Sequence, residues 1–168
     1  GLQVKIVAPH YQPTQYYCRK GFHALNAQMA CDSHRRIIWC STLCCGSTHD
    51  SAAFNHSTLG KLLVEPSHAI HPLFYWLAGD DAYKGPANNC CSVLTPYDSP
   101  CTPKQDNFNA WLSICHINIE CAFGMLVHRW GILHRCLNHP RAMEHATLLV
   151  HVLAKLHNIA CDFKVPMS

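Results

Sequence analysis

The sequence predicts a folded α/β chain with strands near its beginning and long helices toward its end. Three patterns lead to this prediction: polar and apolar residues alternate early in the chain, a short apolar run before residue 79 ends in acids, and apolar residues recur every three or four positions after residue 107. Apolar residues make up 49% of the chain and charged residues 14%, which excludes disorder as its main character. The 168 residues are expected to form one domain, residues 1–168.

The first part of the chain predicts a three-stranded meander. Residues 2–8 alternate with the period of a strand, and two further strand-like runs follow at residues 22–31 and 36–42. The turn between the last two runs falls at residues 32–34, which have the composition of a turn.

The middle of the chain predicts one helix, one buried strand and one loop. The helix is expected over residues 51–64, with Thr48 or Asp50 as its cap and Gly60 as an unfavourable residue inside it. The apolar run at residues 73–78 is typical of a buried strand with acidic residues at its carboxyl end. Residues 84–104 are rich in proline, which predicts an irregular loop.

Two helices are predicted to complete the chain. The spacing of apolar residues predicts a long amphipathic helix from Asn107 to Leu133 with one buried stripe and a possible interruption at Gly124 or Gly131. A second helix is expected to begin around Pro140, because the fixed backbone angle of proline suits a first turn, and to include Ile159.

The charge and apolar tracts limit the partners of the chain. A net charge of +3 does not identify a nucleic-acid-binding polycation, but it allows a local basic groove. The most apolar tract, residues 146–160, is interrupted by His151, Lys155 and His157, which predicts no membrane partner. The first residues lack the features of a signal peptide, so cytosol or nucleus is the expected compartment.

The chain is rich in cysteine and histidine, with 12 and 14 residues. Disulfides are not expected, because several cysteines lie in apolar periodic stretches, where a thiol packs as a small hydrophobic group. No C-x2-C pair is present, and the adjacent pairs at 44–45 and 90–91 suit a tetrahedral metal poorly. A structural zinc protein is kept as the weakest alternative. The cysteines inside periodic stretches are Cys31, Cys40, Cys115 and Cys121.

Three of the ten acidic residues stand at informative positions: Asp50, Asp80 and Glu120. Carboxylates at a strand end and on a helix that packs on the sheet can share divalent cations, and hard oxygen ligands favour Mg²⁺ or Mn²⁺. The residues alone leave a structural alternative open, in which Asp50 caps a helix, Asp80 ends a strand in a turn and Glu120 forms a surface ion pair.

Six sequence blocks carry a resemblance to a known family. They are residues 17–28, 46–51, 79–83, 94–97, 108–109 and 120–124, and residues 156–159 form a closing block. In this order they resemble the DDE endonuclease domain of PIF/Harbinger transposases and their domesticated nuclease relatives, over nearly the whole chain. The resemblance implies an RNase H-like fold, with a mixed β-sheet flanked by helices and long C-terminal helices. It also implies a carboxylate cluster that binds two divalent metals for DNA strand cleavage and transfer.

The resemblance assigns catalytic and metal-binding roles to three residues. Asp50 matches the acid of the family's G-S-x-H-D block, Asp80 the acid of its L-G-D-S-A-Y block, and Glu120 the glutamate of its E-R-A-F-G block. Asp81 stands where the family usually has a small polar residue and is a second candidate, ranked below Asp80.

The sequence departs from the family pattern at several positions. Gly1 aligns with a glycine that follows the family's first catalytic aspartate, so that acid would lie immediately before Gly1. Removing one bridging carboxylate weakens metal binding, and the chain alone is therefore expected to be inactive or nearly so. Cys121 and His116 stand where the family commonly has arginine, which points to a degenerate copy.

The resemblance implies DNA as the partner, and basic residues are the expected contacts, because phosphate neutralisation dominates nucleic-acid affinity. No helix-turn-helix or zinc finger is visible in the sequence, so target recognition would require a lost N-terminal segment or a separate DNA-binding partner protein, and the expected location is the nucleus. The alternative function is a catalytically dead RNase H-like module that binds DNA or another protein. The basic residues expected to contact DNA are Arg19, Lys20, Arg129 and Arg135.

Overall fold

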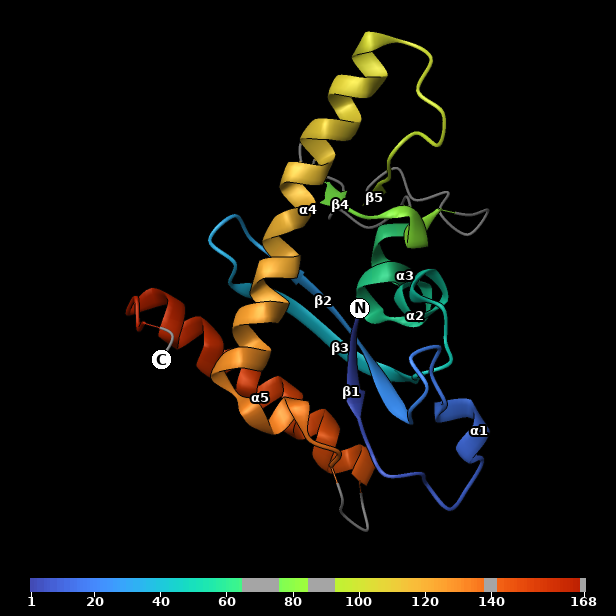
Figure 1. Ribbon diagram of the computed structural model, residues 1–168, viewed down its shortest axis with the longest axis vertical. Helices are drawn as coiled ribbons and strands as arrows, with labels where there is room; N and C mark the ends of the chain where they lie inside the picture. Colours follow the sequence, from blue (N-terminus) through green and yellow to red (C-terminus); the bar gives the residue numbers. More distant parts are fainter. Residues whose placement is uncertain (65–75, 85–92, 138–141, 167–168) are drawn as a thin grey trace. The chain divides into compact units, whose positions relative to one another are not determined.

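The structure, a computed structural model, describes residues 1–64, 76–84, 93–137 and 142–166 (Figure 1). The chain divides into two compact units. Unit 1 comprises Gly1–Thr48 and Ile119–Ser168, and unit 2 comprises His49–Asn118. The chain is mixed α/β, with an antiparallel sheet and a parallel strand pair, as expected for an RNase H-like fold.

Unit 1 contains the predicted meander. Strands β1 (Leu2–Lys5), β2 (Ala24–Cys31) and β3 (Ile37–Cys45) form an antiparallel sheet in the order β1-β2-β3. Helix α1 (Pro13–Tyr16) lies in the connection between β1 and β2. Strand β2 is the central strand and is buried along most of its length. The meander prediction is therefore confirmed, with β3 extending three residues beyond the expected end.

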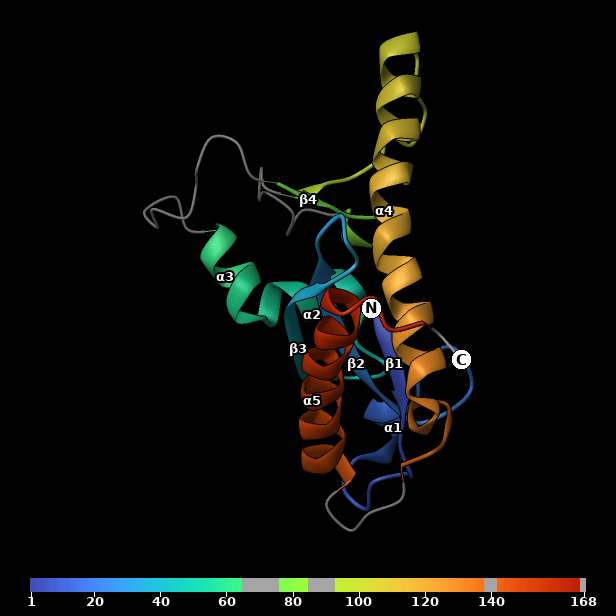
Figure 2. The same ribbon diagram turned by 90° about the vertical axis from the view of Figure 1, so that its left-hand side faces the viewer.

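The core of unit 1 forms where helices pack on this sheet. Helix α5 (Ala142–Asp162) contacts β2 and β3 and lies along the sheet in Figure 2. Val4 of β1, Leu126 of α4 (Pro103–Arg129) and Val150 of α5 are at most 1% exposed and belong to one apolar cluster. Cys31 and Cys40 pack against this cluster, as predicted for small hydrophobic groups.

The closing block at the end of the chain fastens α5 to the start of β3. The side-chain amide of Asn158 accepts a hydrogen bond from the Ile37 backbone N–H at 2.7 Å and donates one to the Ile37 carbonyl at 2.8 Å. The neighbouring His157, which is fully buried, donates from Nε2 to the Arg35 carbonyl at 2.9 Å. These side chains satisfy backbone groups of the β2–β3 connection that would otherwise need water.

Helix α4 (Pro103–Arg129) is longer at its beginning than predicted. Proline at the first helical position is favourable, because its missing N–H has no partner there. Thr102 and Gln105 form a capping box, in which Gln105 N donates to Thr102 Oγ1 at 3.3 Å and Thr102 N donates to Gln105 Oε1 at 3.2 Å. The expected loop therefore ends at residue 102. At its other end the helix gives way at Arg129 to a 3-10 turn, η2 (Gly131–His134).

The predicted helix over residues 51–64 is two helices, α2 (Asp50–His56) and α3 (Thr58–Val64). The break falls at Ser57, which is fully buried and whose Oγ donates to the Phe54 carbonyl and accepts from Gly60 N. The N-cap of α2 is His49 instead of Thr48 or Asp50. Thr48 turns its hydroxyl back toward Cys45 Sγ, and Asp50 already lies in the first turn.

Unit 2 also contains two short strands and a 3-10 turn. Strands β4 (Leu77–Ala78) and β5 (Val93–Leu94) pair in parallel, so the segment expected to be a loop contains a strand. The turn η1 (Asp81–Tyr83) follows β4. The first three residues of the predicted strand at 73–78 and the predicted helix start at Pro140 lie outside the described residues.

The ten cysteines in the described segments are free thiols, as expected without disulfides. Burial raises the pKa of Cys31 and Cys40 to about 11 in each case, with the Asp32 charge adding to the effect at Cys31. Both thiols therefore stay protonated at neutral pH, which makes them poor nucleophiles and poor metal ligands.

By length and composition α4 is apolar enough to cross a membrane. The sequence prediction considered residues 146–160 instead and did not identify this helix. A core helix of a soluble protein can pass the same test but is mostly buried, whereas only 17% of the apolar window of α4 is buried. The prediction that the chain has no membrane partner stays a prediction.

Candidate active site

Two of the three predicted carboxylates lie at the ends of neighbouring elements of unit 2. Asp50 is the first residue of α2 and is half-buried, in the turn where a negative charge interacts favourably with the helix dipole. Asp80 follows β4 and caps η1, because its Oδ1 accepts a hydrogen bond from Ala82 N at 3.0 Å. Its side chain is 47% exposed. The structural alternative for Asp80, a strand end in a turn, is thus also present in the structure.

Tyr83 connects these two carboxylates. Its ring packs edge-to-face on Phe54 of α2, with ring centroids 5.9 Å apart. Burial raises the pKa of the Tyr83 hydroxyl, and the negative charges of Asp50 and then Asp80 raise it further. Both carboxylates therefore act on the same phenol, which stays protonated and can donate a hydrogen bond.

The raised pKa of Tyr83 predicts a loss of stability at alkaline pH. An unfolded tyrosine titrates near pH 10, whereas folded Tyr83 keeps its proton to higher pH. The unfolded chain therefore releases the proton first, and the free energy of unfolding falls as pH rises above about 10. In urea unfolding at about pH 9 and about pH 11, Tyr83→Phe should lose less stability than the wild type between these values. An equal loss in both proteins would contradict this assignment.

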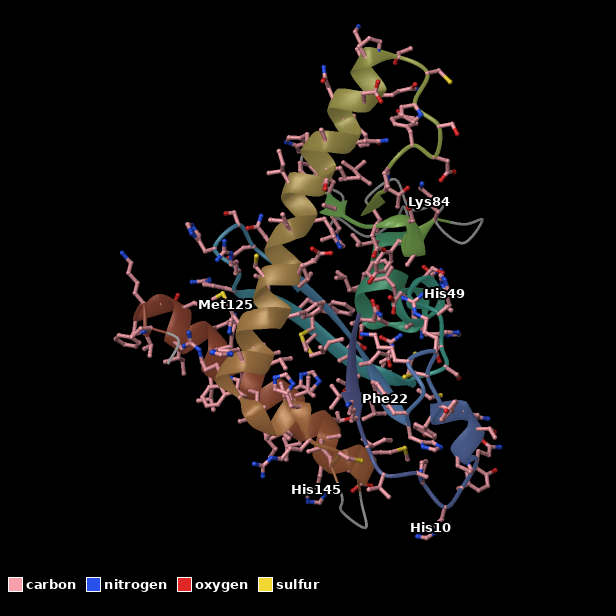
Figure 3. The ribbon with its side chains drawn as sticks, in the orientation of Figure 1. His10, Phe22, His49, Lys84, Met125 and His145 are labelled. Carbon is pink, nitrogen blue, oxygen red and sulfur yellow. The ribbon has the colours of Figure 1, made fainter. Side chains whose placement is uncertain are left out.

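Two further side chains lie near Asp80 within unit 2. The His116 Nε2 is 4.0 Å from Asp80 Oδ2, so a protonated His116 would form an ion pair with it. Lys84, labelled in Figure 3, forms ion pairs with Asp81, at 2.6 Å, and with Asp98. Asp81 is thus engaged by Lys84 and its side chain is 76% exposed, which supports ranking it below Asp80.

Glu120 and the predicted DNA-contacting residues belong to unit 1. Glu120 lies on the part of α4 after Asn118 and is exposed. Arg19 and Lys20 are exposed in the turn after Cys18, and Arg135 is exposed after η2. Arg129 is half-buried at the end of α4. The structure therefore brings together α2, which begins at Asp50, and η1, which Asp80 caps, and it distributes the basic residues over separate segments of unit 1.

The donors in unit 2 fit a hard divalent cation. Carboxylate oxygens are the ligands that Mg²⁺ and Mn²⁺ prefer. After burial, the charges of Asp50 and Asp80 each add to the raised pKa of the half-buried Tyr83, and a bound cation would compensate these charges. Within the described segments, no three His, Cys, Asp or Glu side chains are gathered as a metal site, so neither a complete magnesium site nor a zinc site is assembled by these residues alone.

Gly46, the first residue of the sequence block at residues 46–51, lies where the backbone of other segments approaches closely. A Cβ on Gly46 would lie 2.8 Å from the carbonyl oxygens of both Ala24 and Tyr16, which is too close for any side chain. The adjoining Thr48 carbonyl accepts from Asn26 Nδ2 at 2.9 Å. This block therefore follows a fixed path along the sheet of unit 1 up to Thr48.

The chain is a mixed α/β protein, and sequence comparisons identify its family. Residues 1–158 match the DDE superfamily endonuclease family, and the chain belongs to it. The chain is 28% identical over 166 residues to the human protein named Putative nuclease HARBI1, covering 96% of this chain and 44% of the human protein. The proteins of the same name from cattle and rat give the same values.

The chain thus spans less than half the length of the curated relatives that it matches. No solved structure matches it significantly. The family assignment made from the sequence blocks is therefore confirmed by the comparison of residues 1–158.

Tyr83 is the residue that sequence reasoning missed. It lies inside the block at residues 79–83, so its position was noted without a role. Its contact with Phe54 and its electrostatic coupling to Asp50 join segments about 30 residues apart along the chain, and neither is visible in a local pattern.

Proposed function

We propose that the chain is a metal-dependent DDE nuclease domain in which Asp50, Asp80 and Glu120 hold Mg²⁺ or Mn²⁺ and act on phosphodiester bonds of DNA. The observation that carries the proposal is the contact between α2, which begins at Asp50, and η1, which Asp80 caps, in a member of the DDE endonuclease family. Glu120 enters through its match to the family's glutamate block.

Asp80, Tyr83 and His116 would have different roles in such a metal-dependent site. The cation supplies a Lewis acid that stabilises the attacking and leaving oxygens of the phosphodiester. Asp80 Oδ1 accepts a hydrogen bond from Ala82 N, and Oδ2, which lies 4.0 Å from His116 Nε2, would face a cation when His116 is neutral. Tyr83 keeps its proton and can donate a hydrogen bond to a phosphate oxygen. His116, 4.0 Å from Asp80, would bring a positive charge to the site when protonated.

DNA binding, a separate DNA-binding partner protein and a nuclear location are parts of the same proposal. Exposed cations gain most of their affinity for DNA from phosphate neutralisation, which suits the surface positions of Arg19, Lys20 and Arg135.

A catalytically dead DNA-binding module is the second candidate. It is favoured by one observation, namely that Asp80 already has a structural role as the cap of η1. This candidate predicts DNA binding that does not change when metal is added or removed, whereas a metal-dependent site predicts tighter DNA binding with Mn²⁺.

Calorimetric titration with Mn²⁺ tests the nuclease proposal. Asp80→Asn should weaken Mn²⁺ binding at least about tenfold, because a neutral amide is a poor replacement for a carboxylate ligand. Asparagine also accepts N-cap hydrogen bonds, so η1 should keep its geometry. Asp98→Asn is the matched control, since Asp98 is an 83% exposed acid of the same unit. Wild-type protein that binds no Mn²⁺, or equal binding by both variants, would overturn the proposal.

A further inference from the structure

A pocket of about 300 Å³ lies in unit 1, between the β2–β3 turn and the C-terminal ends of α4 and α5. Ser33 and Arg35 line it from the turn, Arg129 from α4, and Cys161 and Lys164 from the end of α5. Met125 of α4, labelled in Figure 3, contributes to its wall. None of the acidic residues proposed to bind metal lies in its lining.

The lining of this pocket is positively charged. It includes the side chains of Arg35, Arg129 and Lys164 and no acidic residue. None of the three forms an ion pair with an acid in the segments that the structure describes. The two nearest acids, Asp32 and Asp162, are instead paired with Arg36, at 3.2 and 3.0 Å.

The guanidinium of Arg129 has unused hydrogen-bond donors at this pocket. Its Nη2 donates to the Val165 carbonyl at 3.1 Å. Its Nε and Nη1 are buried and have no hydrogen-bond partner among the described residues. Buried donors without a partner are costly, and those of a charged group more so. Rotation of the guanidinium toward the pocket on binding would let an oxyanion accept charge-assisted hydrogen bonds from them.

The backbone holds the other two cations in an uncommon conformation. Only three non-glycine residues in the described segments have a positive φ, and two of them, Arg35 at 65° and Lys164 at 51°, line this pocket. Lys164 occupies the position of a Schellman motif where glycine is usual. The motif is closed by Val165 N donating to the Ala160 carbonyl and Lys164 N to the Cys161 carbonyl. Strained conformations of this kind concentrate at functional sites.

The same hydrogen bonds remove an obstacle to anion binding. The C-terminal end of a helix carries partial negative charge on its last carbonyl groups. Here the carbonyls of Ala160 and Cys161 are bonded within the Schellman motif, and Arg129 covers the Val165 carbonyl. At Cys161, which lines the pocket, burial and the charges of Asp162 and Asp32 raise the pKa of the thiol, while Arg129 lowers it.

We propose that this pocket binds a phosphate group through Arg35, Arg129 and Lys164. The volume accommodates a phosphate group together with ordered waters, since one water occupies about 30 Å³ in the liquid. Two sources share this chemistry, a backbone phosphodiester of DNA and free phosphate. The DNA source rests on the proposed function, whereas the phosphate site itself does not.

The first test is an NMR titration of the ¹⁵N-labelled chain with inorganic phosphate, with sodium chloride at equal ionic strength as reference. Saturable shifts are expected at the amides of residues 33–35 and 160–165. The double variant Arg35→Gly, Lys164→Gly should abolish them, and it should remain folded because glycine suits a positive φ. Gln12→Gly, at the third residue with positive φ, controls for the backbone change, and Arg135→Gln controls for charge. An absence of shifts, or shifts that persist in the double variant, would overturn the proposal.

The second test measures the salt dependence of binding to a short DNA duplex by fluorescence anisotropy. If the phosphate comes from DNA, the double variant should lower the slope of log affinity against log salt by about one per cation removed. If the double variant keeps the wild-type salt slope, and the wild type binds inorganic phosphate in the first test, the pocket is assigned to free phosphate. If the wild-type protein bound phosphate but no Mn²⁺, the nuclease proposal would be rejected while the phosphate site would be retained.

Discussion

Replacing Asn158 by alanine is expected to destabilise unit 1 by about 3 kcal/mol, because two backbone groups lose their partners. The amide of Asn158 bonds both the N–H and the carbonyl of Ile37, a residue that is only 7% exposed. Water reaches such a position poorly, so the desolvation of both groups would not be compensated. The effect is large for a side chain that contributes no apolar packing.

Urea unfolding monitored by circular dichroism measures this effect. Lys155→Ala is the matched control, since Lys155 is an exposed residue on the same helix and its replacement should change stability by less than about 0.5 kcal/mol. If Asn158→Ala unfolded at the same urea concentration as the wild type, the two hydrogen bonds between Asn158 and Ile37 would not contribute to stability.

Gly60→Ala is expected to destabilise unit 2 by about 3 kcal/mol through overpacking. A Cβ at this position would lie 2.1 Å from the Phe54 carbonyl oxygen and 2.8 Å from the carbonyl carbon of the same residue. Both are backbone atoms, so no side-chain rotation relieves the contact. Helix α3 would have to move away from α2, which would stretch the Ser57 hydrogen bonds that join them.

Gly124→Ala provides a control of opposite sign. Gly124 lies inside α4, and a Cβ there would meet no atom within 4 Å. Alanine is favoured over glycine in a helix by about 1 kcal/mol, so this variant should be more stable than the wild type. Thermal unfolding of the two variants should therefore give shifts in opposite directions. A stabilised Gly60→Ala protein would refute the close approach of α3 to Phe54.

The sequence predicts the elements of the fold where the signal is local, and it fails where an element depends on packing between distant residues. The strands at residues 2–5, 24–31 and 37–45 were predictable, because alternation is a local signal that the sheet reproduces. The break at Ser57 was not predictable from periodicity, because it depends on which residues pack across the turn. The early start of α4 had a local signal, the capping box at residues 102–105, that the proline count of the loop obscured.

The two candidate sites, the carboxylates and the basic pocket, also differ in how far the sequence predicts them. Asp50 and Asp80 were identified from short blocks whose order matches a family, and their role as metal ligands stays a prediction. The basic pocket had no comparable signal. Its three cations lie on a turn and at two helix ends, as much as 129 residues apart from Arg35 to Lys164, and only the fold brings them together. Of the four predicted DNA-contacting residues, Arg129 alone lines it.

The discontinuity of unit 1 has a consequence for synthesis on the ribosome. Its sheet is encoded before residue 49 and its covering helix α5 after residue 141, with the 70 residues from His49 to Asn118 in between. The sheet therefore leaves the ribosome long before Asn158 and Val150 are available to cover it. Until then the apolar face of the nascent meander is exposed, which makes this interval the period of greatest risk of aggregation and of greatest need for a chaperone.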